Sequence, residues 1–255
     1  MGLEVFRLDG RVSIVTGGSK GLGEAMAMAL AGAGSRVVIV SRNLEESQQV
    51  ADRITAATRQ ETLALKVDVT RKVEVEQMAQ GTLARFGRID VLVNNAGINI
   101  RKPLLEAEDQ EWEAVFDVNL KGPMFCSRAV GKVMVEQRSG SIINMASMMS
   151  FVSIPGRASY STSKAGLVGM TRALALEWAP YNVRVNALCP GPFATPMNKA
   201  LLEDRGVREF FVSRIPLGRF AEPQELEGAV VFLASNASSF VTGSALLIDG
   251  GWTAQ

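Results

Sequence analysis

Short runs of apolar and β-branched residues alternate along the chain with longer stretches in which apolar residues recur every three or four positions. The short runs predict seven strands, at Val12–Thr16, Arg36–Ser41, Leu63–Asp68, Val91–Asn94, Ser141–Ala146, Val183–Leu188 and Ala245–Ile248. The longer stretches predict helices, among them Leu22–Ala33, Val73–Phe86 and Tyr160–Trp178. Because continuous apolar strands are buried on both faces, this alternation predicts an α/β fold with a doubly wound, seven-stranded parallel sheet and helices on both faces.

The chain contains no linker-like stretch, so residues 1–255 are expected to form a single domain. The span from about Thr195 to Phe211 has no place for a strand and is interpreted as an insertion near the end of the sheet. Because this insertion follows the sixth strand, residues 195–216 are expected to cover the substrate as a lid.

Composition excludes several classes of function. The 27 basic residues nearly balance the 26 acidic ones, so neither nucleic acid nor a membrane surface is an expected partner. Met1–Gly10 carries charges and lacks the apolar core of a signal sequence, which favours a cytoplasmic protein. The chain has no histidine, so Ser-His-Asp and Cys-His hydrolysis and histidine-based zinc sites are excluded, and no metal is expected. Cys126 and Cys189 are expected to be reduced and buried.

A glycine-rich loop joins the first predicted strand to the first helix. It holds Gly17, Ser19, Lys20, Gly21, Leu22 and Gly23. Glycines allow backbone amides to approach a pyrophosphate, and the helix N-terminus adds a partial positive charge. The spacing G-x-x-x-G-x-G differs from the usual G-x-G-x-x-G, and a simple turn is the alternative. The position between strand and helix favours dinucleotide binding.

The second predicted strand ends at Ser41 and Arg42, without the acidic residue that binds the ribose 2′-hydroxyl in many NAD sites. Arg42 could pair with a 2′-phosphate, and Lys20 could add a second positive charge. NADP is therefore the expected cofactor and NAD the less favoured one, unless both side chains are ordinary surface charges. Asp68 and Val69, which close the third strand, are expected to bracket the adenine, although Asp68 could instead cap the next helix through Thr70.

A set of short motifs resembles the short-chain dehydrogenase/reductase family over nearly the whole chain. The matching pieces are Thr16-Gly17-x-x-x-Gly21-x-Gly23, Asn94-Asn95-Ala96-Gly97, Val118-Asn119-Leu120, Ser147, Tyr160-x-x-x-Lys164, Pro190-Gly191 and Asp249-Gly250-Gly251. The resemblance implies a Rossmann-like fold, a nicotinamide cofactor, a small carbonyl or alcohol substrate and a homotetramer. It also implies that Asn94, Asn95, Ala96, Gly97, Pro190, Gly191 and Thr195 border the cofactor.

The chemistry of Tyr160 and Lys164 supports this resemblance. The two residues are four positions apart on a predicted helix and therefore share a face. An ammonium at about 4 Å would stabilise a phenolate by roughly 4 kcal/mol at an effective dielectric constant of about 20. That is an upper bound of roughly three pKa units, enough to bring Tyr160 toward neutrality as a general acid/base. An ordinary exposed helix pair is the alternative.

The resemblance implies roles for further residues and for the cofactor contacts of this pair. Ser147 and Tyr160 would bind the substrate oxygen, and Asn119 would hold a water in a proton relay to Lys164. Tyr160 and Lys164 would also contact the cofactor.

Arg101 lies on a loop that leaves the predicted active-site edge, where a guanidinium could bind a substrate carboxylate or simply be solvated. Ile98–Pro103, Met145–Ser150, Glu177–Ala179 and Asp249–Trp252 resemble sugar-acid members of the family, such as gluconate 5-dehydrogenases and deoxygluconate 3-dehydrogenases. A 3-oxoacyl-carrier-protein reductase is the alternative enzyme. A dinucleotide-sensing regulator without turnover is an alternative of another class.

Overall fold

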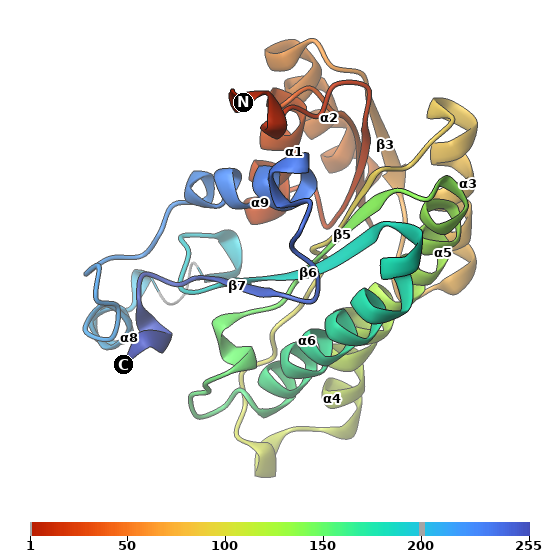
Figure 1. The fold of residues 1–255 in the computed structure, drawn as a ribbon. Coiled ribbons are helices and arrows are strands. Elements are labelled where there is room, and N and C mark those ends of the chain that lie inside the picture. Colours follow the sequence, from red (N-terminus) through yellow and green to blue (C-terminus); the bar gives the residue numbers. More distant parts are fainter. Residues whose placement is uncertain (1, 199–201) are drawn as a thin grey trace.

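The computed structural model describes residues 2–198 and 202–255, and its strands form one parallel sheet (Figure 1). The strands are β1 (Val12–Thr16), β2 (Arg36–Ser41), β3 (Thr62–Lys66), β4 (Val91–Asn94), β5 (Gly140–Met145), β6 (Val183–Pro190) and β7 (Ala245–Ile248). Their spatial order is β3-β2-β1-β4-β5-β6-β7. The order reverses between β1 and β4, which is where ligands bind in doubly wound folds. The predicted seven-stranded, Rossmann-like α/β fold is confirmed.

Helices lie on both faces of the sheet (Figure 1). They are α1 (Gly21–Gly32), α2 (Leu44–Thr58), α3 (Lys72–Phe86), α4 (Asp109–Phe116), α5 (Gly122–Gln137), α6 (Ala158–Trp178), α8 (Arg205–Val212) and α9 (Glu227–Ala234). One apolar cluster joins the sheet to α1, α2 and α9, and a second joins it to α3, α5 and α6. In the described residues no helix is long and apolar enough to cross a membrane.

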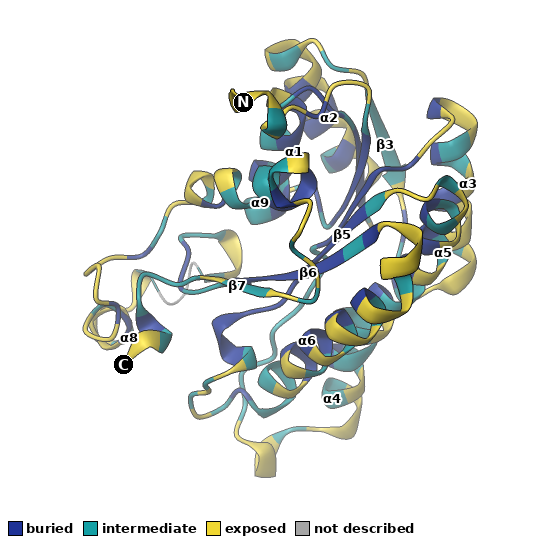
Figure 2. Cartoon of the chain, in the orientation of Figure 1, coloured by how far each residue is buried: buried dark blue, intermediate teal, exposed yellow. Residues whose placement is uncertain are grey.

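The two-residue period of the strands explains both clusters. In β2, Val37 and Ile39 pack in the first cluster, whereas Val38 and Val40 pack in the second. All four side chains are fully buried, which Figure 2 shows as dark blue strands between helices that are yellow on their outer sides. The core therefore occupies both faces of the sheet and leaves its carboxyl edge for a site.

Some predicted boundaries were wrong by one or two residues. β3 ends at Lys66, because the backbone N–H of Asp68 already donates to the Glu74 carboxylate and starts the next turn. β6 continues to Pro190, since its pairing with β7 extends to Ile248. The few residues at these strand ends carried no periodic signal from which either boundary could be predicted.

The predicted insertion contains no strand among its described residues, as expected. It contains a short 3-10 helix, η6 (Pro196–Asn198), and α8. Residues 199–201 lie outside the described part of the chain. Phe211 of α8 packs with Met148, Phe220 and Trp252 in a small apolar cluster. This cluster ties α8 to the C-terminal end of the chain, beside the carboxyl edge of the sheet.

Candidate active site

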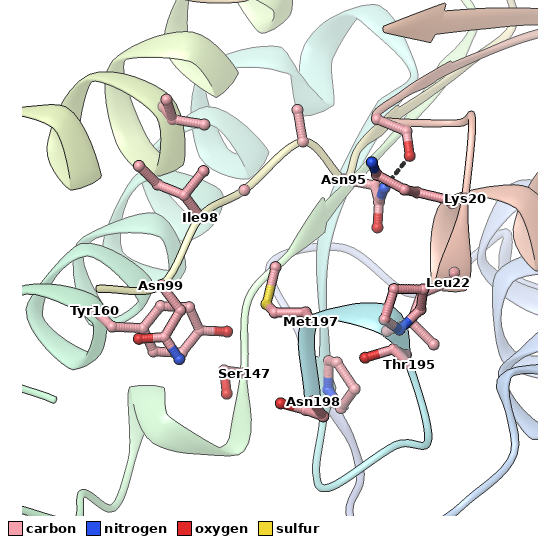
Figure 3. Close-up of a pocket in the computed structure, with 18 of the residues that line it drawn as sticks. Lys20, Leu22, Asn95, Ile98, Asn99, Ser147, Tyr160, Thr195, Met197 and Asn198 are labelled. Atoms are coloured by element: carbon pink, nitrogen blue, oxygen red, sulfur yellow. Dashed lines mark hydrogen bonds between the residues drawn. The ribbon is translucent and has the colours of Figure 1, made fainter. Parts of the chain in front are cut away.

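A cavity of about 1070 Å³ opens at the carboxyl edge of the sheet, over the point where the strand order reverses. It is large enough for a dinucleotide and a small substrate. Most of the predicted site residues line it: Gly17, Ser19, Lys20, Gly21, Leu22, Gly23, Ser41, Arg42, Asp68, Val69, Asn95, Ala96, Gly97, Arg101, Ser147, Tyr160, Pro190, Gly191 and Thr195. In Figure 3, Lys20 and Leu22 lie on one side of this cavity and Tyr160 and Ser147 on the other.

The glycine loop is built around Asn95. The Asn95 side-chain amide donates to the carbonyl oxygens of Thr16 and Gly17, each at 3.0 Å, and Figure 3 draws one such bond as a dashed line. Gly17 has φ +62°, and a Cβ on Gly23 would clash with the Gly17 carbonyl oxygen and lie 2.5 Å from Asn95 Nδ2. The side chain of Lys20, the N-cap residue of α1, makes no capping hydrogen bond. The loop therefore leaves a close, amide-rich approach of the kind that a pyrophosphate needs.

Tyr160 and Ser147 face each other at the other end of the cavity (Figure 3). Ser147 follows β5, and its hydroxyl accepts a hydrogen bond from Met149 N at 3.1 Å. Burial raises the pKa of Tyr160, and the Ser147 hydroxyl and the charges of Arg157 and Arg101 only partly oppose this. The expected lowering of the Tyr160 pKa is therefore not present in this structure.

The position of Lys164 explains the difference. Its Nζ donates to the Met145 carbonyl oxygen at 2.6 Å and lies 5.7 Å from the centroid of the Tyr160 ring. Burial lowers the pKa of Lys164 to about 8. The ammonium form of Lys164 is therefore less stable than the argument from the sequence assumed. Lys164 is only 4% exposed, which excludes an ordinary exposed helix pair.

Asn119 lies in a π-helical turn, η3 (Asp117–Lys121), between α4 and α5. Such turns occur frequently at functional sites. Asn119 is fully buried, accepts from Ile98 N at 2.8 Å and donates to Ile98 O at 2.9 Å. A Cβ added to Gly97 would be 3.3 Å from Asn119 Oδ1 and 3.6 Å from Lys164 Nζ. Asn119 therefore holds the loop after β4 next to Lys164, although neither side chain lines the cavity itself.

Comparison with known proteins places this geometry in a family. A family model described as enoyl-(acyl carrier protein) reductase matches residues 17–253. The chain is 40% identical over 254 residues to the 2-dehydro-3-deoxy-D-gluconate 5-dehydrogenase of Dickeya dadantii, covering 99% of each chain. It is 42% identical over 248 residues to the 3-oxoacyl-[acyl-carrier-protein] reductase of Synechocystis, covering 96% of this chain and 97% of the relative.

A solved structure, the gluconate 5-dehydrogenase of Burkholderia cenocepacia in complex with NADP and tartrate, superposes with a TM-score of 0.96 at 38% identity and 99% coverage of both chains. The chain is a member of the short-chain dehydrogenase/reductase family. It is therefore an oxidoreductase, and the resemblance of its motifs to this family is confirmed.

Two predicted cofactor contacts of this family member need correction or refinement. Asn94 is 2% exposed and lies below the cavity, where it donates to Ser127 Oγ and Asn144 Oδ1. Because its amide is used inside the core, Asn94 links strands and helix rather than lining the cofactor site. Asp68 lines the cavity and also accepts from Thr70 N and Thr70 Oγ1, but the N-cap residue of α3 is Arg71, so these bonds form a turn before the helix and do not cap it.

The region around the end of β2 contains an acidic residue that the sequence argument did not consider. Glu46, in the first turn of α2, accepts from Ser19 Oγ at 3.1 Å and lies 3.8 Å from Lys20 Nζ. Lys20 is thus partly neutralised by a carboxylate. Arg42 is exposed at the cavity and has no ion pair in the described part of the chain.

Two arginines lie near Tyr160. Arg101 Nη2 donates to Met197 O at 3.0 Å and to Asn198 Oδ1 at 3.1 Å, so Arg101 is bound to η6 while remaining partly exposed. Arg157, which the sequence argument did not single out, precedes α6, is 8% exposed and lines the same cavity. Its position three residues before Tyr160 was the one feature of the sequence from which a place in this cavity could have been predicted.

Other cavity residues were missed as individual positions because their contribution depends on how loops fold over the sheet. They include Asn43, Ile98, Asn99, Met148, Met149, Phe193, Met197, Asn198, Phe211 and Phe220. Neither spacing nor residue type distinguished most of them from ordinary loop or core residues.

Proposed function

We propose that this protein is an NADP(H)-dependent oxidoreductase that interconverts a secondary alcohol and a ketone of a sugar acid or a related polyol. The observation that carries the proposal is the placement of Tyr160 and Ser147 in a cavity that also contains the glycine loop, with buried Lys164 beneath. The similarity to sugar-acid dehydrogenases over 99% of the chain supports the substrate class.

NADP is proposed over NAD because Arg42, at the end of β2, pairs with no carboxylate of the described chain, and because an acidic residue at this position would disfavour a 2′-phosphate. The Burkholderia cenocepacia relative is described in complex with NADP, which supports the same choice. The carboxylate of Glu46 would disfavour a 2′-phosphate, but this side chain is 42% exposed and already pairs with Lys20 and accepts a hydrogen bond from Ser19. We therefore assign the 2′-phosphate contact to Arg42, with Lys20 in a secondary role.

The chain's own residues supply binding and proton transfer in this reaction. When bound, the reduced nicotinamide supplies the hydride to the carbonyl carbon. Ser147 donates a hydrogen bond to the carbonyl oxygen, and the Tyr160 hydroxyl gives that oxygen its proton. Lys164 and a water held at Asn119 return a proton to Tyr160. In the oxidation of an alcohol the same groups act in the reverse direction.

The substrate end of the cavity is assigned to Arg101 and the predicted lid. Arg101 would bind a substrate carboxylate, and the described lid residues 195–198 and 202–216 would cover it, because η6 supplies Met197 and Asn198 to the cavity. Positive charge at this end is suited to an acid.

A 3-oxoacyl-carrier-protein reductase is the second candidate, supported by the 42% identity to the Synechocystis enzyme. A neutral 3-oxoacyl group needs no cation beside Tyr160, whereas Arg101 and Arg157 both lie there. Retention of Ser147, Tyr160 and Lys164 in one site argues against a regulator without turnover.

Steady-state NADPH oxidation with 5-ketogluconate, a neutral ketone and a 3-oxoacyl thioester tests the proposal. We expect turnover with the keto acid and a loss of kcat by orders of magnitude in Tyr160→Phe, with NADPH still bound. Tyr181→Phe, which changes the chain's other tyrosine, is the matched control and should retain activity. Near-normal turnover in Tyr160→Phe would refute the mechanism. Preference for the thioester would favour the second candidate.

We also propose that the enzyme is a cytoplasmic homotetramer, as its family resemblance implies. Large apolar side chains on the monomer surface support self-association, among them Leu176 at 79% and Phe240 at 102% exposure. Light scattering of the purified protein tests the tetramer. A monomer at micromolar concentration would contradict it.

A further inference from the structure

Arg157 is a buried cation that has no counter-ion among the described residues. Within that part of the chain its buried Nε has no hydrogen-bond partner, and its Nη1 donates to the adjacent Gly156 carbonyl oxygen at 3.1 Å. In the described residues it forms no ion pair. Leaving a charged group buried and unpaired is costly, so such a group in a cavity indicates a ligand of opposite charge.

A second guanidinium lies close to it. Arg101 lines the same cavity, and its positive charge lowers the pKa of Arg157 in addition to the effect of burial. Arg101 uses Nη2 for Met197 and Asn198, which leaves Nε and Nη1 without a partner among the described residues. The guanidinium groups of Arg101 and Arg157 repel each other beside Tyr160, and one anion bound between them would stabilise both.

The charge of the cavity differs between its two ends. The acidic lining residues Glu46 and Asp68 lie with the glycine loop and β3, and both bind neighbouring side chains. The third, Asp117, pairs with Lys121. No acidic residue contributes to the pKa shifts of Arg101 or Arg157. The end of the cavity next to Tyr160 is therefore cationic.

We propose that Arg157 is a substrate-binding, specificity-determining residue that forms, with Arg101, a two-guanidinium site for the carboxylate of a polyhydroxy acid. Arg157 is the member fixed at the start of α6, and Arg101 is the member linked to the lid through η6. Because Arg157 precedes Tyr160 by three residues on the same element, the carboxylate is held at a set distance from the proton donor. This proposal rests on the proposed function and names the group by which the substrate is selected.

The test compares two ligands of the same carbon skeleton. Tartrate and threitol both have four carbons and two central hydroxyls, but tartrate has carboxylates where threitol has hydroxymethyl groups. Binding of each to the full-length protein is measured by calorimetry with saturating NADPH, because the reduced cofactor cannot accept a hydride and neither alcohol can then be oxidised. We expect the parent protein to prefer tartrate.

Arg157→Met should weaken tartrate binding on the order of tenfold to a hundredfold, the range expected for a hydrogen bond to a charged group, and leave threitol unchanged. Arg157→Lys should recover only part of the loss, because lysine lacks the planar fork. Arg128→Met removes an exposed arginine outside the cavity and should change neither ligand.

A structural role for Arg157 predicts a different pattern. Replacing an unpaired buried charge by methionine should keep or raise the thermal midpoint, whereas a structural role predicts a lower midpoint and equal losses for both ligands. Equal losses, no loss, or tighter binding of glycerol 3-phosphate than of tartrate would each overturn the carboxylate site. If tartrate binding depends on Arg157 but no polyhydroxy acid or keto acid turns over, the proposed function fails and the site stands.

Discussion

Gly23 provides a direct test of how the glycine loop is built. A Cβ at this position would overlap the Gly17 carbonyl oxygen and lie 2.5 Å from Asn95 Nδ2, so Gly23→Ala must displace the loop. Inserting a methyl group into a packed site costs about 1–3 kcal/mol. Displacing Asn95 also weakens its two 3.0 Å bonds to Thr16 and Gly17, at about 1 kcal/mol each.

The sum predicts that the free energy of unfolding falls by roughly 3–5 kcal/mol in Gly23→Ala. For a domain of this size that corresponds to a decrease in the thermal midpoint of roughly 6–20 °C. Affinity for NADPH should fall at least about tenfold, because the amides that approach the pyrophosphate move with the loop.

The matched control is Gly81→Ala in α3, where an added Cβ meets nothing within 4 Å. Alanine is favoured over glycine in a helix by up to about 1 kcal/mol, so this variant should be slightly stabilised and bind NADPH normally. Urea denaturation and fluorescence titration with NADPH measure both quantities. A Gly23→Ala protein within about 0.5 kcal/mol of the parent, with unchanged NADPH affinity, would refute this account of the loop.

Two further predictions concern the charges of the site. Arg42→Asp should shift the ratio of kcat/KM from NADPH toward NADH, because it removes the cation for the 2′-phosphate and adds an acceptor for the ribose hydroxyl; an unchanged ratio would place the phosphate contact at Lys20. Burial lowers the pKa of Lys164 to about 8 in the folded protein, from near 10.5 in the unfolded chain. The buried charge therefore destabilises the folded state fully below pH 8, and this effect disappears as the pH rises toward 10.5. Lys164→Met should therefore abolish turnover yet raise the free energy of unfolding at pH 7 by a few kcal/mol, with a smaller gain at pH 10.5. Urea titrations at the two pH values measure this, and an equal effect at both would contradict it.

The candidate active site shows where sequence reasoning was sufficient and where it was not. The family resemblance implied that Ser147 and Tyr160 bind the same substrate oxygen, and the structure brings both residues to one cavity. The pKa argument for Tyr160 was wrong for this structure, because the four-residue spacing does not specify where the lysine ammonium points. Lys164 Nζ binds the Met145 carbonyl oxygen, and this contact depends on how α6 packs on β5.

The alternation of apolar runs by itself determined the parallel sheet, since a strand buried on both faces and a helix with one apolar face each have a local signature. The glycine spacing determined the loop at the end of β1, because only residues without a side chain fit where Gly23 meets Gly17 and Asn95. Tertiary structure alone decided that Asn94 turns into the core, that Glu46 approaches Lys20 and that Arg101 binds η6. It also left Arg157 buried with no counter-ion in residues 2–198 and 202–255. These contacts join residues from separate elements, and their geometry follows from the packing of loops and helices over the sheet, which no local pattern encodes.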